Sequence, residues 1–265
     1  MATTLPWMRS CGLTCSMGIT NKPQNEKNML TINKSDALWE TIFRQRELKR
    51  PITGPLHFEG DEEAFQALVK HPKTLRVAIV GTNNPSFRAK RNVYRIVKML
   101  KAMGEEKGFK PVIVSEQGLG INMIALRAAL SVGLPTVAVT RSGPEVAYLN
   151  KLEYLADIIK TTPGCGLLSS SVDWSMAYAT NFINRFYTIV MMSDLLIVPE
   201  SEEFDAAITS AEFAFENDIP VLAVPGRPID RHSVGCNKLI SCGRAKIFYD
   251  LDKLPTIPEI TPDNP

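Results

Sequence analysis

The sequence predicts an α/β fold of the Rossmann-like, doubly wound type, with a mostly parallel sheet and a small N-terminal helical extension. Three observations predict it. After Lys73, short runs rich in β-branched residues alternate with segments of helical period, a pattern typical of parallel strands joined by helices. Several of these runs end in glycine-bearing loops. The chain has 265 residues, of which 45% are hydrophobic, and can therefore bury a full core.

The N-terminal part is expected to differ from the rest of the chain. Residues 1–30 mix Thr, Ser, Gly, Pro and Asn without periodicity, so we expect a mobile leader. Residues 31–75 are expected to form a small helical segment. Its first helix covers Ser35–Leu48 and its second covers Asp61–Lys70, and Pro51–Pro55 links them.

The Rossmann-like domain is expected over residues 76–250, followed by a proline-rich tail over 251–265. Its strands are expected at Arg76–Gly81, Pro111–Ser115, Thr136–Thr140, Gly166–Ser169, Asp194–Glu200, Val221–Pro225 and Ala245–Tyr249. The clearest helix runs from Ser86 to Lys107, because apolar residues recur on one stripe of it. A second apolar helix covers Ile121–Leu130.

Composition excludes several classes of function. Thirty basic and 28 acidic residues give a formal charge of +2, so overall charge neither requires nor excludes a nucleic acid. The five cysteines have no CxxC spacing and there are only three histidines, so we expect no metal, no cofactor and no disulfide framework, and a cytoplasmic location. No apolar run reaches the roughly 18–20 residues that a membrane helix needs.

Four strand ends carry loops suited to anions, because glycine allows close backbone approach and helix N-termini present N–H groups. The first loop holds Gly81, Thr82, Asn83 and the helix cap Ser86. It is not the GxGxxG of a dinucleotide fold, which disfavours nicotinamide chemistry.

The second loop follows Ser115, and its Gly118 and Gly120 could form an anion-binding nest or a plain strand-to-helix turn. The third and fourth loops lie near the C-terminal end of the domain. Their candidate phosphate-binding residues are Gly226, Gly235, Asn237 and Lys238.

Cations lie near these loops. Arg88, Lys90 and Arg91 fall in the first turn of a helix, where they oppose the helix dipole and therefore suggest an anionic partner, although an ordinary solvated face remains the alternative. With Asn184, Arg185 and Lys238 they could form a track that neutralises successive phosphates of a single strand.

These loops resemble those of the DNA-processing protein A (DprA, also called Smf) family over about residues 76–250. The resemblance rests on Gly81 and Ser86, on Ser115, Gly120 and Ile121, on Thr136 to Leu155 with Gly166–Ser169, and on Gly226, Gly235, Asn237, Leu239, Ile240 and Gly243. The last pattern is the most specific.

The chain also departs from the family. Asn83 stands where the family has arginine, Glu116 and Asn122 break the second motif, and Asn184-Arg185 only partly matches an Arg-Asn-Arg segment. Four carboxylates between Glu200 and Asp205 would repel a polynucleotide unless they form a solvated turn that faces away from it.

The resemblance implies a non-catalytic protein that binds single-stranded DNA, forms a homodimer and hands the strand to a RecA-type recombinase in transformation or recombination. Many family members carry a C-terminal winged helix, for which residues 251–265 leave no room. Two alternatives stay open: a sensor of a small nucleotide, and an enzyme similar to nucleotide phosphoribohydrolases. The enzyme ranks last, because the glycine run of those enzymes has no counterpart between Pro199 and Glu212.

Overall fold

One sheet organises the protein. The computed structural model describes residues 29–52, 54–140, 150–170 and 179–249. Within these ranges the strands are β1 (Met29–Ile32), β2 (Leu56–Gly60), β3 (Thr74–Ile79), β4 (Lys110–Glu116), β5 (Thr136–Val139), β6 (Gly166–Ser169), β7 (Leu195–Val198), β8 (Val221–Ala223) and β9 (Lys246–Ile247). Their order in the sheet is β1-β2-β6-β5-β4-β3-β7-β8-β9. The strands β3 to β9 are parallel to one another. All seven strands predicted for the Rossmann-like domain are therefore present.

The strand order reverses once, between β3 and β7. From β3 the chain moves outward through β4 and β5 to β6, and it then returns to β7 on the other side of β3. In open α/β sheets, ligands bind outside the carboxyl ends of the strands at such a switch point. The loops after β3 and β7 are therefore the first place to look for a site.

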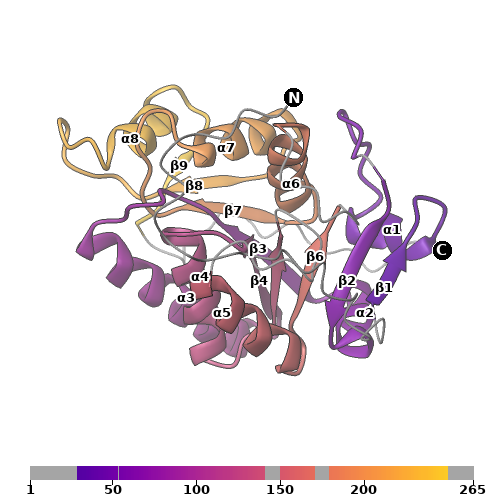
Figure 1. Cartoon of the computed structure of the whole chain (residues 1–265). Helices are drawn as coiled ribbons and strands as arrows, with labels where there is room; N and C mark the ends of the chain where they lie inside the picture. Colours follow the sequence, from indigo (N-terminus) through magenta and orange to yellow (C-terminus); the bar gives the residue numbers. More distant parts are fainter. Residues whose placement is uncertain (1–28, 53, 141–149, 171–178, 250–265) are drawn as a thin grey trace, which may run out of the picture.

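Helices cover both faces of this sheet (Figure 1). They are α1 (Ala37–Ile42), α2 (Glu62–Lys70), α3 (Phe87–Lys107), α4 (Ile121–Ser131), α5 (Asn150–Thr161), α6 (Ala179–Met191), α7 (Ala206–Glu216) and α8 (Val234–Ser241). The side chains of α3 and α4 share one hydrophobic core with alternate residues of the central strands, whereas α1, α2, α6, α7 and α8 pack on the other face. The doubly wound fold predicted from the sequence is confirmed.

The long helix α3 forms where its sequence predicts it. Ser86 caps it, since its Oγ accepts a hydrogen bond from the Ala89 N–H at 3.1 Å. Its apolar stripe from Val93 to Met103 is buried. Gly108, with φ 74°, ends the helix in the left-handed conformation. The polar face of α3 is left to solvent.

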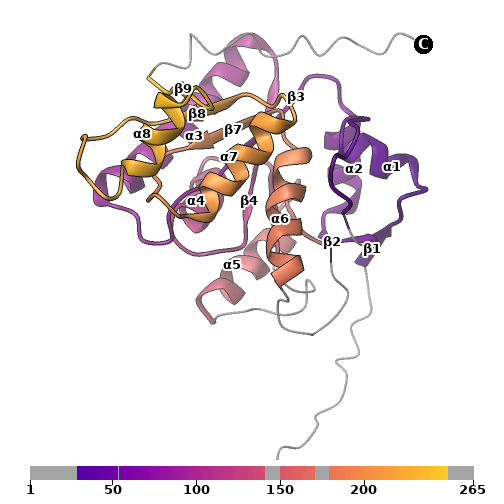
Figure 2. The ribbon, with the colours of Figure 1, turned by 90° about the horizontal axis from the view of Figure 1, so that it is seen from above.

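The N-terminal segment is more than helical. β2 pairs antiparallel with β6, and β1 pairs antiparallel with β2, so the segment extends the sheet beyond β6 (Figure 1). Figure 2 shows α1, α2, β1 and β2 together on one side of the protein. The sequence does not predict these strands, because β2 directly follows the Pro51–Pro55 linker and β1 begins within the stretch expected to be a mobile leader. α1 is also shorter than expected and ends at Ile42, whereas α2 agrees with the prediction and is capped by Asp61.

Buried arginines attach this segment to the domain. The Arg76 guanidinium, 1% exposed, donates to backbone carbonyls of Thr41 and Val69 in the segment and of Met192 after α6. Burial, reinforced by the nearby Arg44, lowers the pKa of Arg76 to about 9. Backbone carbonyl oxygens, the negative ends of peptide dipoles, therefore provide much of the stabilisation of this buried cation.

Asp194 is the carboxylate at the centre of the same junction. It accepts hydrogen bonds from the Arg76 backbone N–H at 2.9 Å and from the Arg44 Nη2 at 3.0 Å. Arg46 lies 3.4 Å away and also donates to the carbonyls of Met191 and Ser193. Burial lowers the pKa of Arg46, although Asp194 opposes that shift.

We expect acid to weaken this attachment through His57 in β2. Burial lowers the pKa of His57, so the ring is protonated more readily in the unfolded chain than in the folded protein. Its contribution to stability is therefore complete above the unfolded pKa near 6.5 and is lost as the pH falls below it. Between pH 7.5 and 5.5 the free energy of unfolding should fall further in the wild type than in His57→Gln. Urea denaturation at both pH values measures this, and equal losses in the two proteins would contradict it.

Two expected features lie outside the described residues: most of the leader over 1–30 and the proline-rich tail over 251–265. No helix in the described ranges is long and apolar enough to cross a membrane.

Candidate nucleic-acid interface

The loops after β3 and β7 are packed against each other at the switch point. The Thr82 N–H donates to the Glu200 carbonyl at 3.0 Å, and the Thr82 carbonyl accepts from the Ile121 N–H, also at 3.0 Å. Gly81 and Thr82 are buried, whereas Asn83 is exposed. The two loops therefore meet directly, and a ligand cannot lie between them at this contact.

Gly120 is required for this packing. Its φ is 66°, and a Cβ at this position would lie 2.1 Å from the Thr82 carbonyl oxygen. The neighbouring Gly118 N–H is already donated to the Glu116 carbonyl at 2.7 Å. Of the two alternatives for this loop, the contacts favour the plain strand-to-helix turn over the anion-binding nest, because Gly120 lets two loops approach each other. Ser115 is unsuited to an anion as well, because it is fully buried and donates to the Ile79 carbonyl.

The phosphate cradle predicted at Ser86 is occupied by an internal carboxylate. Glu200, 4% exposed, accepts a hydrogen bond from the Ser86 N–H at 2.7 Å and another from its Oγ at 2.6 Å. The amino end of α3 is thus partly neutralised by the protein itself. Ser86 positions the helix rather than a phosphate, which corrects the sequence-based expectation.

The loops after β8 are also held together by hydrogen bonds within the protein. The Gly226 N–H donates to Asn237 Oδ1 at 3.1 Å, and Asn237 Nδ2 donates back to the Gly226 carbonyl at 3.2 Å. The Gly235 N–H donates to the Ser201 carbonyl at 2.9 Å. Gly226, Gly235 and Asn237 therefore shape the loops, and their expected role as direct phosphate ligands is corrected. Lys238 is exposed and lies 3.3 Å from Glu203.

Arg185 is not on the surface. Its guanidinium is 1% exposed and donates to Glu116 Oε1 at 2.7 Å, and it lies over the Phe186 ring. The prediction that Arg185 neutralises a phosphate on an open track is corrected, because Glu116 neutralises it instead. Asn184, the residue before it on α6, is half-buried.

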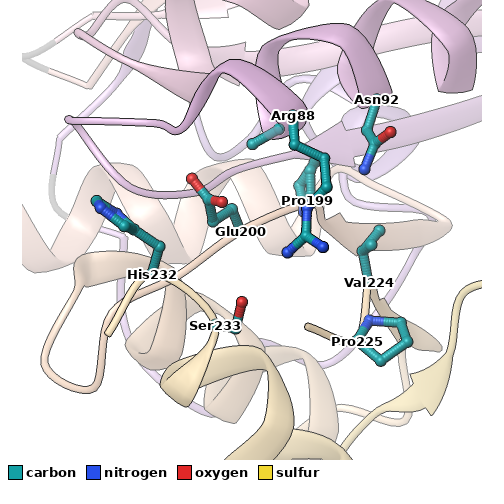
Figure 3. Close-up of a pocket in the computed structure, with 9 residues that line it drawn as sticks. Arg88, Asn92, Pro199, Glu200, Val224, Pro225, His232 and Ser233 are labelled. Atoms are coloured by element: carbon teal, nitrogen blue, oxygen red, sulfur yellow. The ribbon is translucent and has the colours of Figure 1, made fainter. Parts of the chain in front are cut away.

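The cations of α3 are exposed, as the helical stripe predicts. Arg88, Lys90 and Arg91 lie on the solvent face of the first helical turns, and no ion pair involves them within the described residues. Figure 3 shows the Arg88 side chain extending from α3 toward Ser233 and Val224 across a narrow groove. Phe87 beside them is 75% exposed. Together, Phe87, Arg88, Lys90 and Arg91 form what we call the α3 patch.

The acidic stretch after β7 is less open than a solvated turn. Glu200 is bound to Ser86, and Asp205 accepts a hydrogen bond from the Glu202 N–H at 2.7 Å. Glu202 forms an ion pair with Arg231 at 3.0 Å, and Glu203 pairs with Lys238. Local cations and N–H groups thus offset much of the negative charge that would repel a polynucleotide.

A cavity of about 240 Å³ opens on the other side of the contact between the loops that follow β3 and β7. It is lined by Val80, Gly81, Asn83, Glu116, Asn122, Arg185, Phe186, Phe204, Asp205, Ala206 and Ala207. Phe204 is 91% exposed at its rim. Sequence reasoning singled out Glu116 and Asn122 only as departures from the family pattern and did not predict their place in a cavity. Among the described residues, no cluster of His, Cys, Asp and Glu could hold a metal ion.

Comparisons with known proteins agree with this architecture. The family of DNA recombination-mediator protein A matches residues 66–256. DNA processing protein DprA of Streptococcus pneumoniae (strain ATCC BAA-255 / R6) is 30% identical over 187 residues, which are 71% of this chain and 62% of that protein. The match thus spans less than two thirds of the length of that relative.

Two solved structures share the fold. The X-ray structure of DprA from Streptococcus pneumoniae superposes with a TM-score of 0.69 and 25% identity, over 83% of this chain and 71% of that chain. DNA processing protein A from Helicobacter pylori, whose single-stranded DNA binding mode has been studied structurally, gives a TM-score of 0.68 and 22% identity over 86% and 94%. The likeness to the Helicobacter pylori protein shows that the fold is shared and nothing more.

Proposed function

Since the chain belongs to the family of DNA recombination-mediator protein A, we propose that it binds single-stranded DNA through the α3 patch. The Helicobacter pylori relative binds single-stranded DNA. In this chain the buried arginine of α6 is paired with a carboxylate, so phosphates would have to be bound elsewhere.

The observation that carries the proposal is the exposure of Arg88, Lys90 and Arg91 at the carboxyl edge of the sheet. Three cations at the start of a helix oppose its dipole, so they weaken the helix slightly unless an anion lies against them. Phe87, 75% exposed among them, offers a ring on which a base can stack. Cations interleaved with an aromatic ring are typical of surfaces that bind single strands.

We propose binding rather than catalysis. Glu200 and Asp205, two carboxylates of the loop after β7, accept hydrogen bonds from Ser86 and from the Glu202 N–H. A carboxylate held in this way supports the loops and is poorly placed to take a proton from a substrate. This argument disfavours the phosphoribohydrolase-like alternative.

The finer roles implied by the family are part of the same proposal. We propose that the protein acts in the cytoplasm as a homodimer and passes the bound strand to a RecA-type recombinase during DNA uptake or recombination. Pull-down of a RecA-type protein with and without an oligonucleotide tests the partner, and sedimentation equilibrium tests the dimer.

The binding step itself has a direct test. A fluorescein-labelled oligothymidylate of 20 nucleotides should bind the full chain at 50 mM salt, with an affinity that falls as salt rises. If the α3 patch contributes three phosphate contacts, the slope of log K against log salt should be about −2, at roughly −0.7 per contact on a single strand. Fluorescence anisotropy measures it. Absence of binding at 50 mM salt would refute the proposal, and thermal stabilisation by a free mononucleotide instead would favour the nucleotide sensor.

A further inference from the structure

We infer that the cavity lined by Glu116, Asn122 and Phe204 is a nucleobase site that selects a base with an exocyclic amino group. The inference rests on the proposed function, because the base would belong to the strand whose phosphates lie against the α3 patch. Asn83 connects the two places, since it lines the cavity and belongs to the loop that leads into α3.

The charges of the cavity wall argue against a phosphate. Glu116 and Asp205 contribute two carboxylates, whereas Arg185 is the basic residue among the described lining residues. The Arg185 guanidinium is bound to Glu116 at 2.7 Å, so its positive charge is already offset. Over the described lining residues, two carboxylates and one guanidinium leave a net charge of −1, so an incoming phosphate would meet this part of the wall at a cost in Coulomb energy. An uncharged group that donates hydrogen bonds fits this wall better.

Asn122 supplies the acceptor for such a group. Its Nδ2 donates to Glu116 Oε2 at 3.1 Å, and this bond fixes which way the amide faces. Its Oδ1 accepts no hydrogen bond within the described residues, although the side chain is 3% exposed. A buried acceptor that receives no hydrogen bond destabilises the folded protein. After a small shift of the cavity wall, a ligand with a donor group would supply the missing hydrogen bond.

The size of the cavity indicates one base rather than a whole nucleotide. Its volume of about 240 Å³ is below the roughly 300–1,000 Å³ of sites that enclose a complete small ligand. Phe204, 91% exposed at the rim, is placed to stack on a base that enters. The sugar and phosphates would stay outside, toward the cations of α3.

Cytosine and thymine are the pair of bases that separates this site from non-specific binding. Both have a single ring, but cytosine carries an amino group where thymine carries a carbonyl oxygen. The amino group donates to an acceptor such as Asn122 Oδ1, whereas the carbonyl would face that oxygen and the Glu116 carboxylate, which are both hydrogen-bond acceptors. Cytosine should therefore be preferred.

The experiment compares labelled dC20 and dT20 by anisotropy on the full chain at one salt concentration. We expect dC20 to bind about fivefold more tightly, the ratio that one net hydrogen bond provides. Asn122→Leu should reduce this ratio to about one. Ala206→Met, which fills the cavity from a half-buried position, should do the same, and it covers the case in which Asn122→Leu does not fold. Thr209→Met, on the same helix but not in the cavity wall, should keep the wild-type ratio.

Equal binding of dC20 and dT20 by the wild type would overturn the base site and leave the proposed DNA binding standing. Persistence of the preference in folded Ala206→Met would also overturn it. Absence of binding to both strands would refute the proposed function, and the base site with it.

Discussion

Replacement of Asp194 by alanine is expected to lower the free energy of unfolding by about 3–5 kcal/mol, the usual cost of removing one partner from a buried ion pair. Asp194 is 6% exposed and accepts hydrogen bonds from Arg44 and from the Arg76 backbone N–H. Without it, the Arg44, Arg46 and Arg76 cations would lie close together with no carboxylate between them. Urea denaturation at pH 7.5, followed by circular dichroism, measures the change.

Two further variants test whether the charge of Asp194 is the cause of this loss of stability. Asp194→Asn keeps the shape and removes the charge, so it should recover only part of the loss. Glu216→Ala breaks the pair between Glu216 and Arg50, in which both side chains are about half exposed, and should cost less than about 1 kcal/mol. A similar cost at the two sites would show that Asp194 is an ordinary surface partner and that our account of the junction is wrong.

The double variant Arg88→Ala with Arg91→Ala is expected to weaken binding of oligothymidylate about tenfold at 50 mM salt. The salt slope should become shallower by about 1.4, because each phosphate contact on a single strand contributes roughly 0.7. Both side chains are exposed, so the variant should unfold at nearly the wild-type temperature. Anisotropy over a salt series measures both effects.

The matched control removes the same charge at the opposite end of the helix. Lys107 and Lys110 are exposed near the C-terminal end of α3, about 30 Å from Phe87 along a helix of this length. Lys107→Ala with Lys110→Ala should keep the wild-type slope. If both double variants behave alike, net charge rather than the α3 patch governs binding.

The parts of the fold that depend on local patterns could be predicted. The buried stripe of α3, its Ser86 cap and the strands after Lys73 follow from spacing within about 20 residues, and all are present. β2 could not be predicted in this way. Its partner β6 lies more than 100 residues away, with Gly60 opposite Gly166, and a short strand after Pro55 gives little signal of its own.

Prediction of the candidate site from the sequence has the same limit, because it depends on residues that are far apart along the chain. Exposure of Arg88 and Arg91 follows from their place opposite the apolar stripe, so the sequence was informative there. The partner of Arg185 is Glu116, 69 positions away, and a pattern read along the chain cannot reveal that two such residues are buried together. The glycine loops were located correctly, but whether glycine admits a ligand or another loop depends on what lies opposite it. For Gly120 that neighbour is the Thr82 carbonyl.

The antiparallel attachment of β2 to β6 also bears on how the chain avoids self-association. A parallel sheet that ended at β6 would present a row of unpaired N–H and C=O groups, which is a template for aggregation. Residues 29–60 cover that row, and the Phe58 ring lies against Gly166 where no side chain could fit. Shortened forms that start at residue 66, where the family match begins, would uncover it. Residues 29–60 therefore move the open edge of the sheet from β6 to β1, and truncated versions should retain them so that β6 stays paired.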